Sequence, residues 1–222
     1  MPTTTIYSES NDGHVNTSGS NWVSIRDNVN GTGYDRTGTT GAYSIRASDS
    51  SGRGSTTYFI SRAFFEFDVS DINHLPKSGT LQIYGSNFGN SSVEAIKGTQ
   101  SNPLGLSDFD SIEGWDGSSS DGAAAGDNRL NVTDYGTSHI SSWSTSGYNT
   151  FTLTQQALVD IAGSDLLKVC LIDPDYDLRD ITPSGLSTNY SGVRYSEYGS
   201  TSSDPKLVIE EQDSSVFFGT NF

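Results

Sequence analysis

The chain is poor in cysteine, in basic residues and in long apolar runs. Cys170 is the one cysteine among 222 residues, so no intrachain disulfide can form. The 12 Lys and Arg residues stand against 27 Asp and Glu residues, which gives a formal net charge of −15. Nucleic acids and anionic membrane surfaces are bound mainly through Lys and Arg, so we expect neither as a partner. No apolar run approaches the ~20 residues of a membrane helix, which argues against membrane insertion.

Hydrophobic residues are scarce, at 32% of the sequence, whereas glycine is abundant at 24 residues. Glycine supplies the backbone conformations that turns require, so this composition is typical of a sheet protein with many loops. The 11 Tyr, 10 Phe and 3 Trp residues argue against disorder. A length of 222 residues suits one all-β domain with a substantial core.

The N-terminal segment MPTTTIYSES has neither the basic nor the apolar region of a secretory signal peptide. We therefore expect the protein to be made in the cytoplasm and to leave it only by lysis or within an assembly.

The segment SRAFFEFDVSDI, residues 61–72, carries the clearest strand pattern. Phe65, Phe67 and Val69 occupy alternate positions, with Glu66 and Asp68 between them. Successive side chains of a strand point to opposite faces, so the pattern predicts a strand with one apolar and one polar face. Two later phrases, SGTLQIYG and SSDPKLVIE, repeat it.

Short strand-like stretches separated by Gly, Asn and Ser turns predict an all-β protein, an antiparallel jelly-roll β-sandwich with one short helix. The expected strands lie near Thr4–Ser8, Asn21–Arg26, Gly41–Ala47, Ile60–Val69, Thr80–Gly85, Ser92–Lys97, Tyr148–Leu153, Leu166–Ile172, Gly192–Ser196 and Lys206–Glu210. In the helix, Thr154 is the expected N-cap of QQALVDIA, and Gly163 closes the C-terminus. We expect a single domain over residues 1–211.

Two segments do not fit the strand pattern. Residues 101–134 form an irregular acidic stretch, which we expect to be an exposed insertion used in recognition; the alternative is a solvated loop. Residues 212–222 form a tail that is too apolar for a solvated terminus. We expect this tail to dock onto another subunit, the alternative being that it folds back onto the sandwich. Its docking residues are Val216, Phe217, Phe218 and Phe222.

Four phrases resemble the DNRLRE-type, carbohydrate-binding-module-like jelly-roll domains of the kind found in tailed-phage structural proteins. They are Arg62-Ala-Phe-Phe-Glu-Phe-Asp68-Val-Ser70, Gly79-Thr-Leu-Gln-Ile-Tyr84, Phe151-Thr-Leu153 and Asp204-Pro-Lys-Leu-Val-Ile-Glu210. The resemblance covers about residues 6–210. It implies the sandwich fold, and it implies either a phage structural protein or a carbohydrate-binding module.

No catalytic motif stands out. His14, His74 and His139 fall in predicted loops without metal-ligand spacing, and an acidic chain offers many carboxylate pairs without singling one out. We expect no enzymatic activity and name no catalytic residue. Calcium is the candidate ion, because closely spaced carboxylates can converge on a hard cation; the alternative is a solvated acidic loop. The candidate ligands are Asp173, Asp175, Asp177 and Asp180, with a second group at Asp108, Asp110 and Glu113.

Sugars bind to exposed aromatic rings with polar groups nearby. The candidate glycan contacts are Trp115, Trp143 and Tyr176, with packing inside the protein as the alternative. For Trp22 we expect a core position. Arg62 faces the same side as Glu66 in a regular strand, and we expect it to form a cross-strand ion pair that is worth little if it is exposed.

These features together predict a non-enzymatic structural protein on the surface of a tailed-phage virion, of the capsid-decoration or head-fibre or tail-fibre type. Its expected partners are other virion proteins and further copies of itself, and a host-surface glycan is a candidate ligand. It would be made in the host cytoplasm and released by lysis as part of the virion. The alternative function is a carbohydrate-binding module of a polysaccharide-degrading system.

Overall fold

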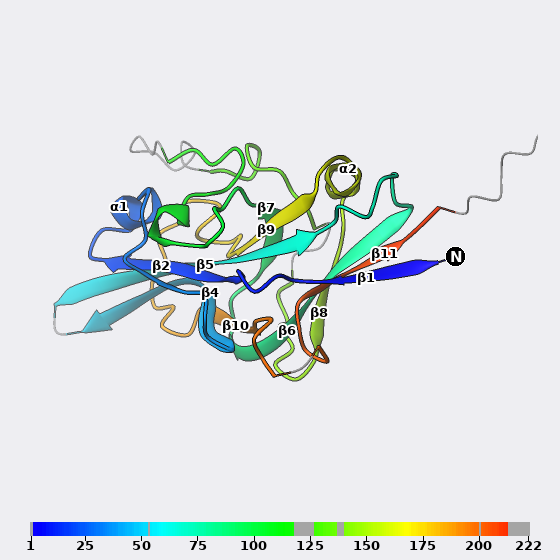
Figure 1. Cartoon of the computed structure of the whole chain (residues 1–222). Helices are drawn as coiled ribbons and strands as arrows, with labels where there is room; N and C mark the ends of the chain where they lie inside the picture. Colours follow the sequence, from blue (N-terminus) through cyan, green and yellow to red (C-terminus); the bar gives the residue numbers. More distant parts are fainter. Residues whose placement is uncertain (1, 53, 118–126, 137–139, 200, 213–222) are drawn as a thin grey trace, which may run out of the picture.

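The computed structural model describes residues 2–52, 54–117, 127–136, 140–199 and 201–212, and these residues form an antiparallel β-sandwich (Figure 1). The predicted all-β class is therefore confirmed. The strands are β1 (Thr3–Tyr7), β2 (Gly13–Gly19), β3 (Gly33–Asp35), β4 (Thr40–Gly52), β5 (Ser55–Asp68), β6 (Ser78–Gly89), β7 (Glu94–Lys97), β8 (Tyr148–Thr152), β9 (Leu166–Ile172), β10 (Tyr190–Arg194) and β11 (Lys206–Glu210). The helical elements are α1 (Trp22–Arg26), the short 3₁₀ helix η1 (Leu106–Asp108) and α2 (Gln155–Gly163).

Two layers can be followed through the strand pairing. One contains β1, β11, β6 and β8 side by side, and the other contains β7, β9, β5, β2 and β3. The long strand β5 also pairs with β4 along its N-terminal half. Strand β10 lies between β4 and the C-terminal half of β6, and so links the two layers at one side.

The main core lies between the layers and is built from the alternation seen in the sequence. Phe65 and Phe67 of β5 are fully buried and belong to the same cluster as Leu81, Phe151 and Leu207 from the facing sheet. The predicted apolar face of this strand is thus confirmed. Burial of side chains of this size is the dominant favourable term for folding.

A second core covers the outer face of β5, where the alternation predicts polar, solvated positions. Phe64 has no exposed surface, and Glu66 is only 2% exposed. The face is covered by Leu104, Phe109 and Ile112, all of them buried, from the segment expected to be an exposed insertion. The described part of residues 101–134 is therefore a packed wall of the domain, and residues 60–67 of β5 are buried on both faces.

Local structure departs from the prediction at the N-terminal end. Asn21–Arg26 is not a strand, because the side chain of Asn21 accepts a hydrogen bond from the Ser24 amide and caps helix α1. Trp22 and Ile25 then share the buried face of that helix, as the spacing i, i+3 requires. Strands β2 and β3 are polar in sequence and were not predicted. The predicted N-cap of helix α2 is confirmed, because the side chain of Thr154 accepts a hydrogen bond from the Ala157 amide.

The first and last strands lie side by side. Thr3 of β1 pairs with Glu210 of β11, at one end of the sandwich, while the β4–β5 hairpin extends from the other end (Figure 1). The proposed docking residues Val216, Phe217, Phe218 and Phe222 lie outside the described residues. Within the described part of the chain, no helix is long and apolar enough to span a bilayer.

Candidate functional site

Arg62 and Asp177 form an ion pair that is fully buried. Arg62 projects from the outer face of β5, and neither side chain has exposed surface. Its Nε and Nη2 donate to the two carboxylate oxygens of Asp177 at 2.8 and 2.7 Å. Nη1 donates to the carbonyl oxygen of Phe109 at 2.8 Å, and Nη2 also reaches that of Arg26 at 3.2 Å. The pair therefore links β5 to α1 and to two loops.

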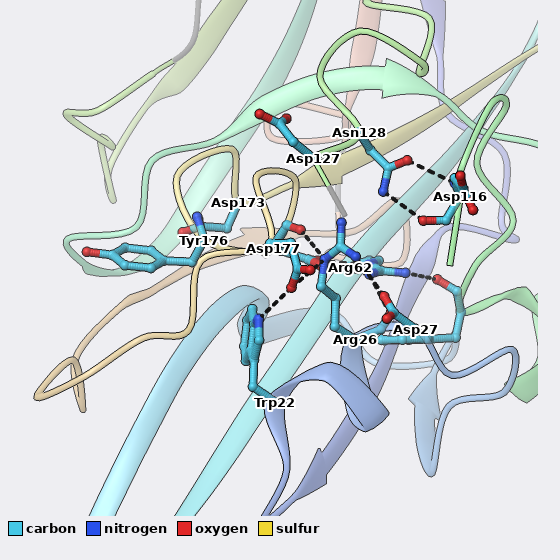
Figure 2. A network of polar contacts seen from close by, with 12 residues as sticks. Trp22, Arg26, Asp27, Arg62, Asp116, Asp127, Asn128, Asp173, Tyr176 and Asp177 are labelled. Carbon is cyan, nitrogen blue, oxygen red and sulfur yellow. Dashed lines mark hydrogen bonds and ion pairs between the residues drawn. The ribbon is translucent and has the colours of Figure 1, made fainter. Parts of the chain in front are cut away.

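A second arginine, Arg26 of helix α1, donates a hydrogen bond to the backbone of the same aspartate. The Nε of Arg26 donates to the backbone oxygen of Asp177 at 2.7 Å, and its Nη1 donates to Asp27 at 2.6 Å. Figure 2 shows both arginines converging on Asp177. Arg26 Nε also lies 3.6 Å from Asp180 Oδ1, which accepts a bond from the indole of Trp22. Each arginine thus has carboxylate and carbonyl partners, as buried charges require.

Trp115 lies against this network. Its ring centroid is 4.0 Å from Cζ of Arg62 and 4.6 Å from Cζ of Arg26, and the ring of Phe109 contacts Arg62 at 4.2 Å. Stacking of guanidinium groups on aromatic rings is favourable, and more so where water is excluded. Trp115 is half-buried, and it stacks on arginines of its own chain. Trp115 therefore has a structural role in this network, and the sugar contact stays a prediction.

The loops next to the network are fixed by Asn128. This fully buried amide accepts a bond from the Asp116 amide at 2.9 Å and donates to the Asp116 carbonyl oxygen at 3.2 Å (Figure 2). The backbone amide of Asn128 donates to the carbonyl oxygen of Leu178. The acidic segment and the loop after β9 are therefore connected through backbone contacts as well as through charge.

Asp173 anchors the start of the same loop. Its carboxylate accepts bonds from Ser91 Oγ at 2.7 Å, from Asn189 Nδ2 at 2.8 Å and from the amides of Asp175 and Tyr176. Burial raises the pKa of Asp173 to about 6, although these hydrogen bonds act in the opposite direction. We call Asp173 and its four hydrogen-bond donors the Asp173 clamp, because they fix the start of this loop.

The calcium expectation must be corrected on this geometry. Asp177 is committed to Arg62, Asp173 to the donors just described, and Asp180 to Trp22 and Arg26. Asp175 therefore has no converging carboxylates beside it. In the described ranges, no group of three or more His, Cys, Asp or Glu side chains is arranged to hold a metal ion.

The second acidic group is also used inside the protein. Asp108 accepts bonds from the amides of Ser101 and Gly105, each at 2.7 Å. Glu113 pairs with Lys97 at 3.1 Å and accepts a bond from Thr133. Asp108 and Glu113 thus stabilise the wall that covers β5.

The other two glycan candidates lie apart from each other. Trp143 is 4% exposed and donates its indole N–H to the carbonyl oxygen of Gly192, so it has no free ring face for a sugar. Tyr176 is half-buried against the second core, close to the Asp173 clamp. The three aromatic residues therefore do not form a common platform.

A carboxylate that the sequence did not single out is buried near the end of β10. Burial, with Glu197 nearby, raises the pKa of Asp12 to about 7. The Ser196 hydroxyl lies within hydrogen-bond distance of both Asp12 Oδ1, at 3.1 Å, and the Glu9 carbonyl oxygen, at 3.2 Å. One hydroxyl proton cannot serve both acceptors fully, and protonation of Asp12 resolves this because the carboxyl group then donates to Ser196.

No protein-family model matches this chain, and no curated protein matches it in sequence. The resemblance to phage and carbohydrate-binding jelly-roll domains therefore stays a prediction, and function must be argued from the geometry of the chain.

Proposed function

We propose that the protein is a non-enzymatic structural protein on the surface of a tailed-phage virion, of the capsid-decoration or fibre type. The observation that carries the proposal is the pairing of β1 with β11 at one end of the sandwich, with Thr3 opposite Glu210. Strand β1 begins and strand β11 ends there, whereas the β4–β5 hairpin lies at the other end (Figure 1). This is the geometry of a domain that is attached at one end and displayed at the other.

The buried network supports a display role over a catalytic one. Arg62 donates to the carboxylate of Asp177, and the two arginines together donate to backbone carbonyl groups of three segments. Breaking such a pair leaves an uncompensated buried charge, so the loops it links are held in one arrangement. A rigid, strongly acidic domain stays soluble at the high local concentration of a particle surface.

The test is the composition of purified particles from a phage that encodes the chain. Mass spectrometry should find the protein in many copies per particle, and immunogold labelling should place it on the outer surface. A protein that stays in the soluble lysate and is missing from purified particles would overturn the proposal.

The attachment site can be tested separately by truncation after Glu211. We expect the truncated protein to fold, since β11 ends at Glu210, but to be lost from particles. Its matched control is the double substitution Ser214→Ala and Ser215→Ala, which changes the same tail without removing apolar side chains. Normal incorporation of the truncated chain would exclude the tail as the docking element.

A carbohydrate-binding module remains the second candidate, and one observation favours it. A pocket of about 290 Å³ opens on the sheet between β2, β5 and β4, and it is lined by polar and aromatic side chains. Neighbouring genes for glycosidases or sugar transporters would support this function, and neighbouring capsid and tail genes would contradict it.

A further inference from the structure

The pocket lies where the inner face of β5 runs beyond the core. Phe65 and Ala63 are core residues, and the next two positions of the same face are Ser61 and Phe59, which line the pocket. Side chains two residues apart on a strand share a face, so the alternation that builds the core also builds this pocket. It is lined further by His14 and Asn16 from β2 and by Tyr43 and Arg46 from β4.

The floor of the pocket is a row of polar side chains across three strands. Asn16 of β2 and Arg46 of β4 are the register partners of Ser61, one on each side. Directly paired residues on one face have Cβ atoms only about 4.5–5.5 Å apart, so the three side chains are neighbours. Ser61 is 2% exposed, and its Oγ has no hydrogen-bond partner among the described residues. Buried hydroxyl groups are normally satisfied, so this one indicates a missing partner.

Arg46 supplies a positive charge without an acidic partner. Its Cζ lies 4.0 Å from the ring centroid of Phe59 and 5.1 Å from that of Tyr43, and its Nε donates to Ser48 Oγ. In the described part of the chain, no carboxylate lies within ion-pair distance of it, although acidic residues outnumber basic ones by 27 to 12. Stacking fixes the guanidinium plane, and a fixed guanidinium fork matches a carboxylate.

His14 adds a hydrogen-bond acceptor. Ser44 Oγ donates to the Gly41 carbonyl oxygen, so it accepts from Tyr195 Oη, and Tyr195 in turn accepts from His14 Nδ1 at 2.9 Å. This chain of bonds places the ring proton on Nδ1. Burial lowers the pKa of His14, although Asp35 acts in the opposite direction, so the ring is neutral near pH 7. Nε2 is then an acceptor on a residue that lines the pocket.

We propose that this pocket binds a sugar that carries a single carboxylate, of the uronic acid type, with the acid on Arg46 and ring hydroxyl groups on Ser61, Asn16 and His14. Neighbouring donors and acceptors at such spacing suit a polyhydroxylated ring. A formal net charge of −15 disfavours polyanions, so one carboxylate is the expected charge. The inference rests on the proposed function for its setting, a displayed domain that meets surface glycans.

Isothermal titration of the purified protein with methyl β-D-glucuronide tests the proposal, with methyl β-D-glucoside and acetate as comparison ligands. The glucuronide should bind at least about tenfold more tightly than either, because only it has both the acid and the hydroxyl groups. No measurable binding of the glucuronide would overturn the proposal. So would acetate binding as well as the glucuronide, which would mark a bare anion site.

Arg46→Gln should weaken glucuronide binding by at least about tenfold. Its matched control is Arg194→Gln, since Arg194 also stacks on two rings, those of Tyr84 and Tyr198, away from this pocket. Equal loss in both variants would contradict the assignment. If Arg46→Gln fails to fold, Asn16→Asp tests the same site, because a carboxylate beside Ser61 repels the ligand acid without changing side-chain size; unchanged affinity in that variant overturns the proposal.

Binding is measured on the free protein, so its failure leaves the particle role untouched. Incorporation of the Arg46→Gln protein into particles separates the two further, since Arg46 lies on β4, which pairs with neither β1 nor β11, and the substitution should not affect assembly.

Discussion

The guanidinium of Arg62 and the carboxylate of Asp177 lie 115 residues apart in the sequence and form a two-pronged ion pair with no exposed surface on either side chain. Four separate segments meet at this pair: strand β5, helix α1, the wall that contains Phe109 and the loop after β9. The pair sits in the second core, which covers the face of β5 opposite the main core.

Asp177→Asn should destabilise the protein by about 3–5 kcal/mol, the usual cost of leaving a buried charge without its partner. The amide keeps the shape of the carboxylate but cannot neutralise Arg62. Urea unfolding measures the loss. Asp175→Asn, two residues away and half-buried, is the matched control and should change the free energy of unfolding by less than about 0.5 kcal/mol. A loss below about 1 kcal/mol at position 177 would show that the pair is not integral to the fold.

Phe109→Ala should cost about 3–5 kcal/mol, as for other fully buried phenylalanines, because Phe109 packs on the outer face of β5 and carries the carbonyl that accepts from Arg62. Leu106→Ala, in the same segment but 40% exposed, should cost less than about 1 kcal/mol. Thermal melting of the two variants compares them. Equal, small effects would mean that the segment is an appended loop, as its sequence suggested.

The sequence predicts the burial of one face of β5 but not that of the other face, which Phe109 covers. The inner face of β5 could be predicted because Phe65, Phe67 and Val69 alternate with polar residues, and period-two patterns are local. The outer face could not, since Glu66 reads as solvated. Its burial comes from a segment more than thirty residues further on, through bonds such as that from Asn102 Nδ2 to Glu66 Oε1.

The candidate site was predictable only in part, for the same reason. Spacing marked Asp173, Asp175, Asp177 and Asp180 as a group, but it did not encode that arginines from α1 and β5 would reach this loop. Nor did any local signal mark Ser61, whose neighbours Asn16 and Arg46 come from two other strands. For helix α1 the signal was present, because Asn21 is a strong N-cap residue.

Removal of divalent cations should leave stability unchanged. The four aspartates of the loop after β9 are held by protein donors or lie apart, so no structural ion is needed to neutralise them. Melting temperatures with and without EDTA should agree, and addition of millimolar Ca²⁺ should not raise them. Stabilisation by calcium that is lost in Asp173→Asn would contradict this and restore the ion at that loop.

Stability should fall as pH rises from about 4 to about 7, because two buried carboxyl groups and one half-buried one hold protons in the folded state. Burial raises the pKa of Asp12 to about 7, that of Glu94 to about 7 and that of Asp173 to about 6. In the unfolded chain such groups lose their protons near pH 4, so across this window the folded state binds more protons. The stabilisation is complete below the unfolded pKa values and is lost as pH passes the folded ones. His14 acts in the opposite sense, since its lowered pKa costs stability below about pH 6.5.

Asp12→Asn isolates one of these contributions, because His14 titrates in both proteins. The amide can keep the network, with its oxygen accepting from Ser8 and from the Ser196 backbone and its NH₂ donating to the Ser196 hydroxyl. Urea unfolding between pH 5 and 8 should show a shallower decline in the variant, by at most about 1.4 kcal/mol per pH unit. Profiles that run parallel would mean that Asp12 is already ionised in the folded protein. The Ser196 hydroxyl would then have to donate to both Asp12 and the Glu9 carbonyl oxygen, and burial would not have raised the pKa of Asp12.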